Sequence, residues 1–434
     1  MSGGRQAGAK PDSGTPGGRV SRRAFLGGTA AVGVTAVGTA AVVTGSGGPA
    51  TTTVASSQPA FRGAHQAGIL AAPAKAGTLV AFRCVDTDRA ALAATLRGLS
   101  EEIEGLMDHR EPAELPGSAP PADNSVLAGV ADPWVSATVS VGASLFDDRY
   151  GLSGVKPREL VTMPPLANDR LDPARTHGDL LLVLHADYPD VCLHALRRIM
   201  RRTRSGLVLH WLLDGFNRPD VSPRPGQTKT RNLLGFKDGT GNPDAGQPAL
   251  MDELVWVGPH DVGPRAGGAG GEPAWAVGGS YQAVRVIRMF VEQWDRAPLS
   301  EQEAIIGRAK GSGAPLDGRA ETDAPAFAAD PKGAKTPLDA HIRLANPRDA
   351  SMAGRFILRR GFSFSRGFDG AGLLDQGLAF VSYQRRLAHF LDTQRRLAGE
   401  PLEEYIEPRG GGFFYALPGV PAGGGWLGQS LLES

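Results

Sequence analysis

Two segments far apart in the chain share one pattern, and this duplication constrains the fold more than any other feature. They are LLLVLHADYPDVCLHALRRI (residues 180–199) and GLAFVSYQRRLAHFLDTQRRL (residues 377–397). Each pattern predicts an apolar strand, a short turn and a basic amphipathic helix. A sheet that buries one face needs a layer packed on that face. We therefore predict an α+β fold with two similar halves, each an antiparallel sheet with helices on one face.

Apolar residues outside the two segments predict further strands and helices along the chain. Ser300 followed by Glu303 predicts a capping box at the start of one helix. The Gly-, Pro- and Asp-rich region 214–275 is predicted to join an N-terminal module, residues 56–225, to a C-terminal module, residues 226–434. The predicted strands are 78–84, 135–145, 179–186, 206–213, 282–292, one within 356–364, and 378–383, and the predicted helices are 88–107, 188–202, 300–307 and 385–397.

The net charge and the cysteine count limit the kinds of partner and metal site that the chain can have. The formal net charge of +1 argues against nucleic acid, because phosphate binding needs a concentrated basic face. The two cysteines, Cys84 and Cys192, are too few for a disulfide framework or a structural zinc site. Their apolar surroundings favour buried free thiols, and a single disulfide stays open for an exported chain.

The N-terminus predicts export. Basic residues precede Ser21-Arg22-Arg23-Ala24-Phe25-Leu26-Gly27, and an Ala/Gly/Val run follows to about Val43. This layout matches a twin-arginine signal peptide, and we assign residues 1–55 to that signal and a linker. Cleavage after Ala40, Ala50 or Ala55 stays open, and so does an uncleaved anchor. The expected location is the periplasm or the extracellular side of the cell envelope.

Three residues in glycine- and proline-rich settings point to a haem site: His341, Asp238 and Arg359. A neutral imidazole can hold haem iron from one side, while a carboxylate and a guanidinium handle peroxide on the other. Arg348 has the charge to pair with a haem propionate. Each residue taken singly has a simpler interpretation, which is a turn aspartate, a hydrogen-bonded histidine or a surface ion pair. The sequence does not identify the partner that would orient the imidazole.

Taken together and in order, several long motifs make the chain resemble the dye-decolorising (DyP-type) peroxidase family. More closely, it resembles the twin-arginine-exported deferrochelatase/peroxidases of bacterial ferrous-iron transport systems. The resemblance covers roughly residues 60–420. The motifs that carry it are GAHQAGI (63–69), VSVGASLFDDRYGL (139–152), NLLGFKDGTGNP (232–243), GGSYQAVR (278–285), HIRLANPR (341–348), LRRGFSF (358–364) and GGGFFYALPGV (410–420).

The resemblance implies two ferredoxin-like modules, with one haem b per chain held mainly by the C-terminal module. It makes Asp238 the distal acid and base, His341 the proximal iron ligand and Arg359 the distal arginine. The remaining expected haem contacts are Gly239, Thr240 and Gly241 at the ring, and Asn346, Pro347 and Arg348 at its edge.

The resulting functional hypothesis is a secreted haem b peroxidase that reduces hydrogen peroxide and oxidises an organic donor. Trp256, Trp275 and Trp294 either carry electrons to the haem or simply pack. One alternative is release of iron from haem as substrate, with a ferrous-iron permease system as partner. Others are a haem-binding or iron-delivery component with little turnover, and a binding module without haem. A homodimer is left open.

Overall fold

Both modules show the strand and helix order that the duplication predicts. The structure is a computed structural model that describes residues 58–113, 115–218, 230–263 and 270–434. Within these residues the N-terminal module comprises β1 (Ala76–Cys84), α1 (Arg89–Met107), β2 (Val135–Gly142), β3 (Leu180–Ala186), α2 (Pro189–Thr203) and β4 (Leu207–Phe216). After α3 (Pro248–Leu254), the C-terminal module comprises β5 (Ser280–Met289), α4 (Val291–Trp294), α5 (Leu299–Ile306), α6 (His341–Ala345), β6 (Leu358–Arg359), β7 (Phe362–Phe368), β8 (Leu374–Gln384), α7 (Leu387–Leu397), β9 (Ile406–Ala416) and α8 (Gln429–Leu432).

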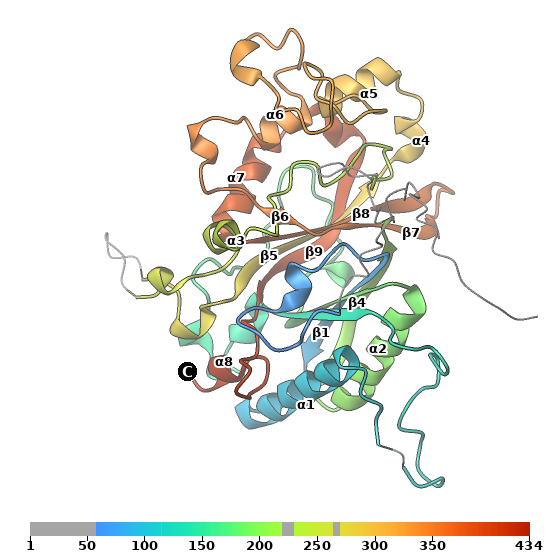
Figure 1. Ribbon diagram of the computed structural model, residues 1–434, viewed down its shortest axis with the longest axis vertical. Helices are drawn as coiled ribbons and strands as arrows, with labels where there is room; N and C mark the ends of the chain where they lie inside the picture. The colour runs from blue at the N-terminus through green and yellow to red at the C-terminus, as the bar shows by residue number, and fades with distance from the viewer. Residues whose placement is uncertain (1–57, 114, 219–229, 264–269) are drawn as a thin grey trace, which may run out of the picture. The chain divides into compact units, whose positions relative to one another are not determined.

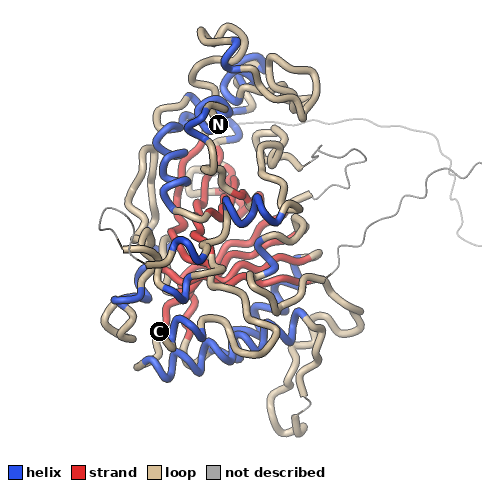
Figure 2. The backbone as a smooth tube through the Cα atoms, turned by 60° about the vertical axis from the view of Figure 1, so that its left-hand side comes forward, coloured by secondary structure: helices blue, strands red, loops and turns tan. Residues whose placement is uncertain are grey.

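The strand order confirms the predicted fold class. In the described chain, the N-terminal strands lie in the order β2-β3-β1-β4 and the C-terminal strands in the equivalent order β7-β8-β5-β9. All the paired strands in both halves are antiparallel. The two α+β modules are thus ferredoxin-like, with strands in the interior and helices outside them (Figures 1 and 2).

The two sheets join at both of their edges. At one edge β2 pairs with the end of β9, where Ser140 lies opposite Ala416. At the other edge Phe216 of β4 lies opposite Ser363 of β7. Because β5 also pairs with β8, the strand order of the described residues returns to its starting strand. The two modules therefore share one continuous sheet.

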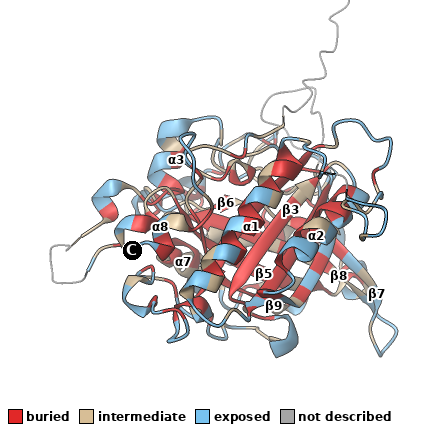
Figure 3. Ribbon diagram, turned by 90° about the horizontal axis from the view of Figure 1, so that it is seen from below, coloured by how far each residue is buried: buried red, intermediate tan, exposed pale blue. Residues whose placement is uncertain are grey.

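The helices α1 and α2 cover the N-terminal sheet, with buried residues toward the strands and exposed ones outward (Figure 3). Asp88 caps α1 by accepting a hydrogen bond from the backbone N–H of Ala91. Pro189 begins α2 at a position where its missing N–H costs nothing. Asp88 and Pro189 thus mark the starts of the two helices, which lie close to the predicted ones.

Two local predictions need correction. The helix at 299–306 has no capping box, because Pro298 takes the N-cap position and Ser300 already lies inside the helix. The strand predicted within 356–364 is two strands, β6 and β7, which pair with successive parts of β8. The break falls at Gly361, where a Cβ atom would lie only 2.7 Å from the carbonyl oxygen of Ala379.

The last strand, β9, was not predicted, and its glycines explain why. Gly410, Gly411 and Gly412 give the segment low strand propensity. In the structure Gly411 has φ +110°. A Cβ atom at this position would lie only 2.1 Å from the carbonyl oxygen of Val284. The pairing of β9 with β5 shifts register between Val286 and Ile287, which is a β-bulge.

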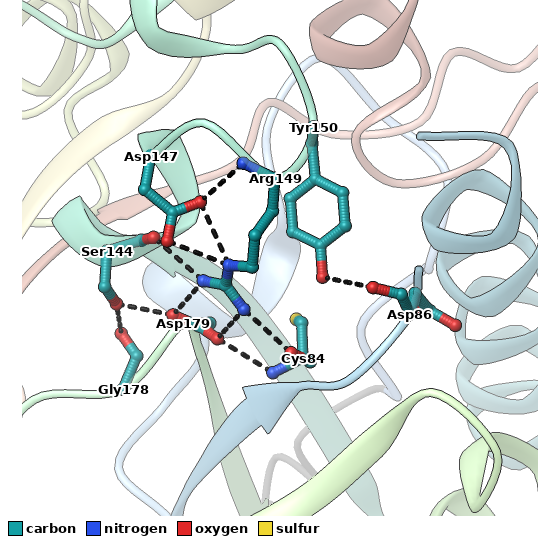
Figure 4. A network of polar contacts seen from close by, with 8 residues as sticks. All are labelled: Cys84, Asp86, Ser144, Asp147, Arg149, Tyr150, Gly178 and Asp179. Atoms are coloured by element: carbon teal, nitrogen blue, oxygen red, sulfur yellow. Dashed lines mark hydrogen bonds and ion pairs between the residues drawn. The ribbon is translucent and has the colours of Figure 1, made fainter. Parts of the chain in front are cut away.

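The motif at residues 139–152 pins the end of the N-terminal sheet (Figure 4). Arg149 donates to both carboxylate oxygens of Asp179, at 3.0 and 3.1 Å, and to the carbonyl oxygen of Cys84 at 2.8 Å. Ser144 donates to the same carboxylate at 2.5 Å, and so does the backbone N–H of Cys84 at 2.8 Å. One buried carboxylate therefore ties β1 to the residues that follow β2.

The remaining sequence predictions about the core have clear outcomes. Cys84 and Cys192 are buried free thiols, and burial raises the pKa of the Cys192 thiol to about 12. Trp256, Trp275 and Trp294 are buried, as the packing interpretation predicts. None of the helices within the described residues is both long and apolar enough to cross a bilayer. The predicted signal, residues 1–55, and the module boundary at 225/226 lie outside the described residues.

Candidate active site

A cavity of about 300 Å³ opens in the C-terminal module beside β5 and β8. Its walls are mostly apolar, with Ile287 and Met289 from β5 and Leu378 and Phe380 from β8. The helices α6 and α7 and the segment 236–241 enclose it, and residues 166–168 of the N-terminal module close one side. An apolar cavity with a few convergent polar groups suits a flat organic cofactor.

His341 is the first residue of α6 and lines this cavity. Its Nδ1 atom lies 2.7 Å from Oε2 of Glu400, whose side chain is only 4% exposed. The carboxylate accepts, so Nδ1 is assigned as the donor, and the neutral tautomer with this bond has its lone pair on Nε2. A carboxylate partner of this kind fixes the orientation of an imidazole and suits it to bind a metal.

Asp238 and Arg359 also line the cavity, and they contact each other. Nη1 of Arg359 donates to Oδ1 of Asp238 at 3.1 Å. Asn242 holds the backbone of Arg359 in place. Its side-chain Nδ2 donates to the carbonyl oxygen of Arg359 at 2.9 Å, and its Oδ1 accepts from the backbone N–H of Arg359 at 3.1 Å. The two side chains are a quarter and a third exposed, which leaves both within reach of a small ligand.

A buried carboxylate, Glu321, fixes the turn that carries Asp238. It accepts hydrogen bonds from Nζ of Lys237 at 2.5 Å and from Oγ1 of Thr240 at 2.9 Å. Gly239, between the two anchored positions, adopts φ +97°, which an L side chain rarely tolerates. Asp238 is thus held from both sides by one side chain that is 1% exposed.

Arg308 and Arg348 are two of the arginines that give the cavity positive charge. Arg308 donates to the carbonyl oxygens of Gly313 and Glu321, at 2.6 and 3.0 Å. Burial lowers the pKa of Arg308, whose side chain is buried, and also the pKa of Arg348, which is more exposed. Among the described residues no carboxylate forms an ion pair with Arg348, which suits it to an external anion such as a propionate.

The structure brings most of the predicted residues to one cavity. Gly239, Thr240, Gly241, Asn346 and Arg348 line it together with His341, Asp238 and Arg359. Pro347 lies between two lining residues without lining the cavity itself. Glu400 and Glu321 were not predicted from the sequence. Both act across long loops, 59 residues from His341 and 81 from Thr240, so no local spacing marks them.

Fold and cavity together define an α+β haem enzyme, in which an apolar cavity offers one ligating imidazole and a separate acid–guanidinium pair. Two family models then match the chain: "Dyp-type peroxidase, N-terminal" over residues 66–217 and "Dyp-type peroxidase, C-terminal" over residues 229–421. The chain belongs to the Dyp-type peroxidase family.

Relatives and solved structures agree with this assignment. The chain is 45% identical over 376 residues to a deferrochelatase of Yersinia pestis bv. Antiqua, covering 86% of this chain and 85% of that protein. It is 46% identical to a deferrochelatase of Escherichia coli O157:H7, covering 86% and 87%. Among solved structures, ferric DtpA from Streptomyces lividans is similar with a TM-score of 0.77 at 34% identity, covering 89% of this chain and 100% of that one. A DyP-type peroxidase from Cellulomonas bogoriensis has a TM-score of 0.73 at 34% identity, covering 86% and 97%.

Proposed function

We propose that the enzyme reduces hydrogen peroxide at a haem b held by His341, with oxidation of an organic donor. The observation that carries the proposal is the pairing of His341 with buried Glu400 in the cavity that also holds Asp238 and Arg359. The imidazole supplies the iron ligand. Arg348 suits a propionate, and Gly239, Thr240 and Gly241 offer backbone that a flat ring can approach closely.

Haem iron, when bound, supplies the redox chemistry that splits the O–O bond and accepts electrons from the donor. Asp238 acts as the base that takes a proton from one peroxide oxygen and as the acid that returns it to the other oxygen, which leaves as water. Arg359 stabilises the negative charge that builds on the leaving oxygen. Its hydrogen bond to Asp238 also orients the carboxylate for both transfers.

The test measures how fast each haem-loaded variant reacts with peroxide, by stopped-flow absorbance. General acid–base catalysis contributes about 10²- to 10⁴-fold, so Asp238→Asn should slow the reaction by that order while haem stays bound. Arg359→Leu should also slow it, because charge stabilisation is lost. Asp244→Asn is the matched control, since this exposed carboxylate bonds only its own loop. Parental rates in Asp238→Asn and Arg359→Leu would refute the distal roles.

A second candidate activity is removal of iron from haem with the porphyrin left intact. It is favoured by the deferrochelatases of Yersinia pestis and Escherichia coli, to which the chain is 45% and 46% identical. Incubation of the enzyme with haem should then produce the fluorescence of iron-free porphyrin. A haem-binding or iron-delivery component with little turnover predicts no such fluorescence and no loss of function in Asp238→Asn. A His341→Ala variant that keeps the parental absorption spectrum would refute His341 as the iron ligand, and with it the proposed haem site.

The proposal extends to location and partners. The paired Arg22 and Arg23 ahead of an Ala/Gly/Val run support export through the twin-arginine pathway to the periplasm or the cell surface. Fractionation of cells that express an Arg22→Lys, Arg23→Lys double variant tests this, because the variant should stay in the cytoplasm. The proposal includes a ferrous-iron permease system as partner, which co-purification tests. It also includes a homodimeric assembly, which light scattering tests.

A further inference from the structure

A second chamber, with a volume of about 210 Å³, adjoins the haem cavity. It lies between the loop Ala71–Ala74 of the N-terminal module and the strands β6 and β8 of the C-terminal module. The two spaces share one wall, formed by residues that line both. These shared residues are Asn232, Asp238, Gly239, Arg359, Leu378 and Phe380. An occupant of the chamber would therefore border the Asp238–Arg359 pair.

Arg360 is a charged residue of this chamber that the proposed mechanism does not use. Its backbone N–H pairs with Val381 of β8, and its Nε donates to the carbonyl oxygen of Ile69 at 2.9 Å. No carboxylate of the described chain forms an ion pair with it. Burial lowers the pKa of Arg360, but a guanidinium stays protonated in proteins. A half-buried cation without a counter-ion is costly and is relieved by an anionic ligand.

The other polar groups do not neutralise Arg360. The only carboxylate that lines the chamber within the described residues is Asp238, which already pairs with Arg359. Arg231 adds a further positive charge and is bonded to backbone carbonyls. Burial, and then the charge of Arg360, lower the pKa of His185 to about 4, so its ring is neutral at pH 7. A neutral imidazole can still donate one hydrogen bond to an anion.

The rest of the lining identifies the kind of anion. Ala71, Ala72, Pro73, Ala74 and Phe380 form an apolar surface that a small inorganic ion would leave unused. Hydrogen peroxide is uncharged at neutral pH and gains little from an unpaired guanidinium. We propose that the chamber binds a small organic carboxylate of about the size of benzoate. Its carboxylate pairs with Arg360, and its apolar part packs against Ala71–Ala74. Any effect of the ligand on catalysis rests on the proposed function, whereas its binding does not.

The probe is benzoate, titrated calorimetrically into the haem-loaded enzyme. Arg360→Gln should weaken binding by at least about tenfold, because a charge-assisted hydrogen bond is lost. Benzamide, which has the same shape but no charge, should bind the parental enzyme at least about tenfold more weakly. Ala72→Trp should also weaken binding, since Ala72 lines the chamber and a larger side chain there takes up part of its volume. Arg204→Gln, an exposed charge at the end of α2, is the matched control.

Several results would overturn the proposal. They are absence of benzoate binding to the parental enzyme, parental affinity in Arg360→Gln or Ala72→Trp, and equal affinity for benzoate and benzamide. Sulfate binding as tightly as benzoate would make the occupant an inorganic anion and reject the organic ligand. If Arg360→Gln fails to fold, Ala72→Trp and benzamide decide. The peroxide kinetics of Asp238→Asn test the proposed function, and benzoate binding tests the chamber. Because the two measurements are independent, failure of one proposal is distinguishable from failure of the other.

Discussion

Substitution of Glu400 tests the most specific feature of the site, its hydrogen bond to His341. The carboxylate is 4% exposed and lies 2.7 Å from Nδ1, so it is the group that fixes the orientation of the ring. Glu400→Gln keeps an acceptor oxygen but removes the charge. Glu400→Ala removes both and leaves the imidazole free to rotate. A graded loss of haem retention should follow.

The size of each step follows from the geometry. A hydrogen bond to a charged group contributes about 1.5–3 kcal/mol, and a neutral one about half as much. Glu400→Gln should therefore cost about 1 kcal/mol, or roughly fivefold in haem affinity. Glu400→Ala should cost more, because loss of an outer partner of a metal-ligating histidine lowers metal affinity by about 10- to 100-fold.

The assay is transfer of haem from each variant to an excess of apomyoglobin, followed by absorbance. Haem should leave Glu400→Ala fastest, Glu400→Gln at an intermediate rate and the parental enzyme slowest. Glu404→Gln, an exposed carboxylate four residues further on, should behave like the parental enzyme. Parental transfer rates in both Glu400 variants would show that this carboxylate does not support the iron ligand, and the assignment of His341 would then lose its structural basis.

Three further predictions follow from other carboxylates and one histidine. Glu321→Gln should slow the peroxide reaction by about tenfold with haem retained, because the turn that carries Asp238 loosens; an unchanged stopped-flow rate would contradict this. Asp179→Asn should lower the free energy of unfolding, measured in urea, by about 2–3 kcal/mol, since the charge-assisted bonds of Arg149 are lost. Burial, and then Arg386, lower the pKa of His389 from 6.5 to about 4, so only the unfolded chain binds that proton between these pH values. Stability should fall by up to about 3 kcal/mol as pH drops through this window, and His389→Gln should weaken that dependence; an identical pH profile would refute it.

The fold class was predictable because its signals are local. The strand, turn and helix of β3–α2 and of β8–α7 each occupy about twenty consecutive residues, and apolar periodicity marks them directly. The helix at 299–306 shows the limit of such signals. A capping box at Ser300 is plausible from spacing alone, but Pro298 has a fixed φ and an extended ψ of 147° and sets the helix start two residues earlier.

The joins between the modules were not predictable, because they depend on pairings between distant strands. A single residue pair, Phe216 with Ser363, connects β4 to β7. Three residue pairs connect β2 to β9. The glycine run in β9 gives it low strand propensity, so the sequence does not predict this strand. Strand pairing across such distances is decided by tertiary packing, which periodicity in one segment does not report.

The candidate site divides in the same way. His341, Asp238 and Arg359 were identified from motifs, and the structure brings them to one cavity. Their supports were invisible in the sequence. Glu400 and Glu321 are ordinary glutamates by spacing, and only folding brings each beside its partner. The residues predicted to contact haem lie in recognisable motifs, whereas the residues that position them act across long sequence separations.

The N-terminal module takes part in the site even though the cavity lies mainly in the C-terminal module. Asn168 donates to the carbonyl oxygens of Glu403, at 3.2 Å, and of Ile406, at 2.7 Å, and it lines the cavity. These bonds hold the short 3₁₀ segment Pro401–Glu404, which directly follows Glu400. The carboxylate that orients His341 is therefore positioned partly from the other half of the duplication. Since the chamber at Arg360 is also bordered by an N-terminal loop, residues from both modules line both spaces.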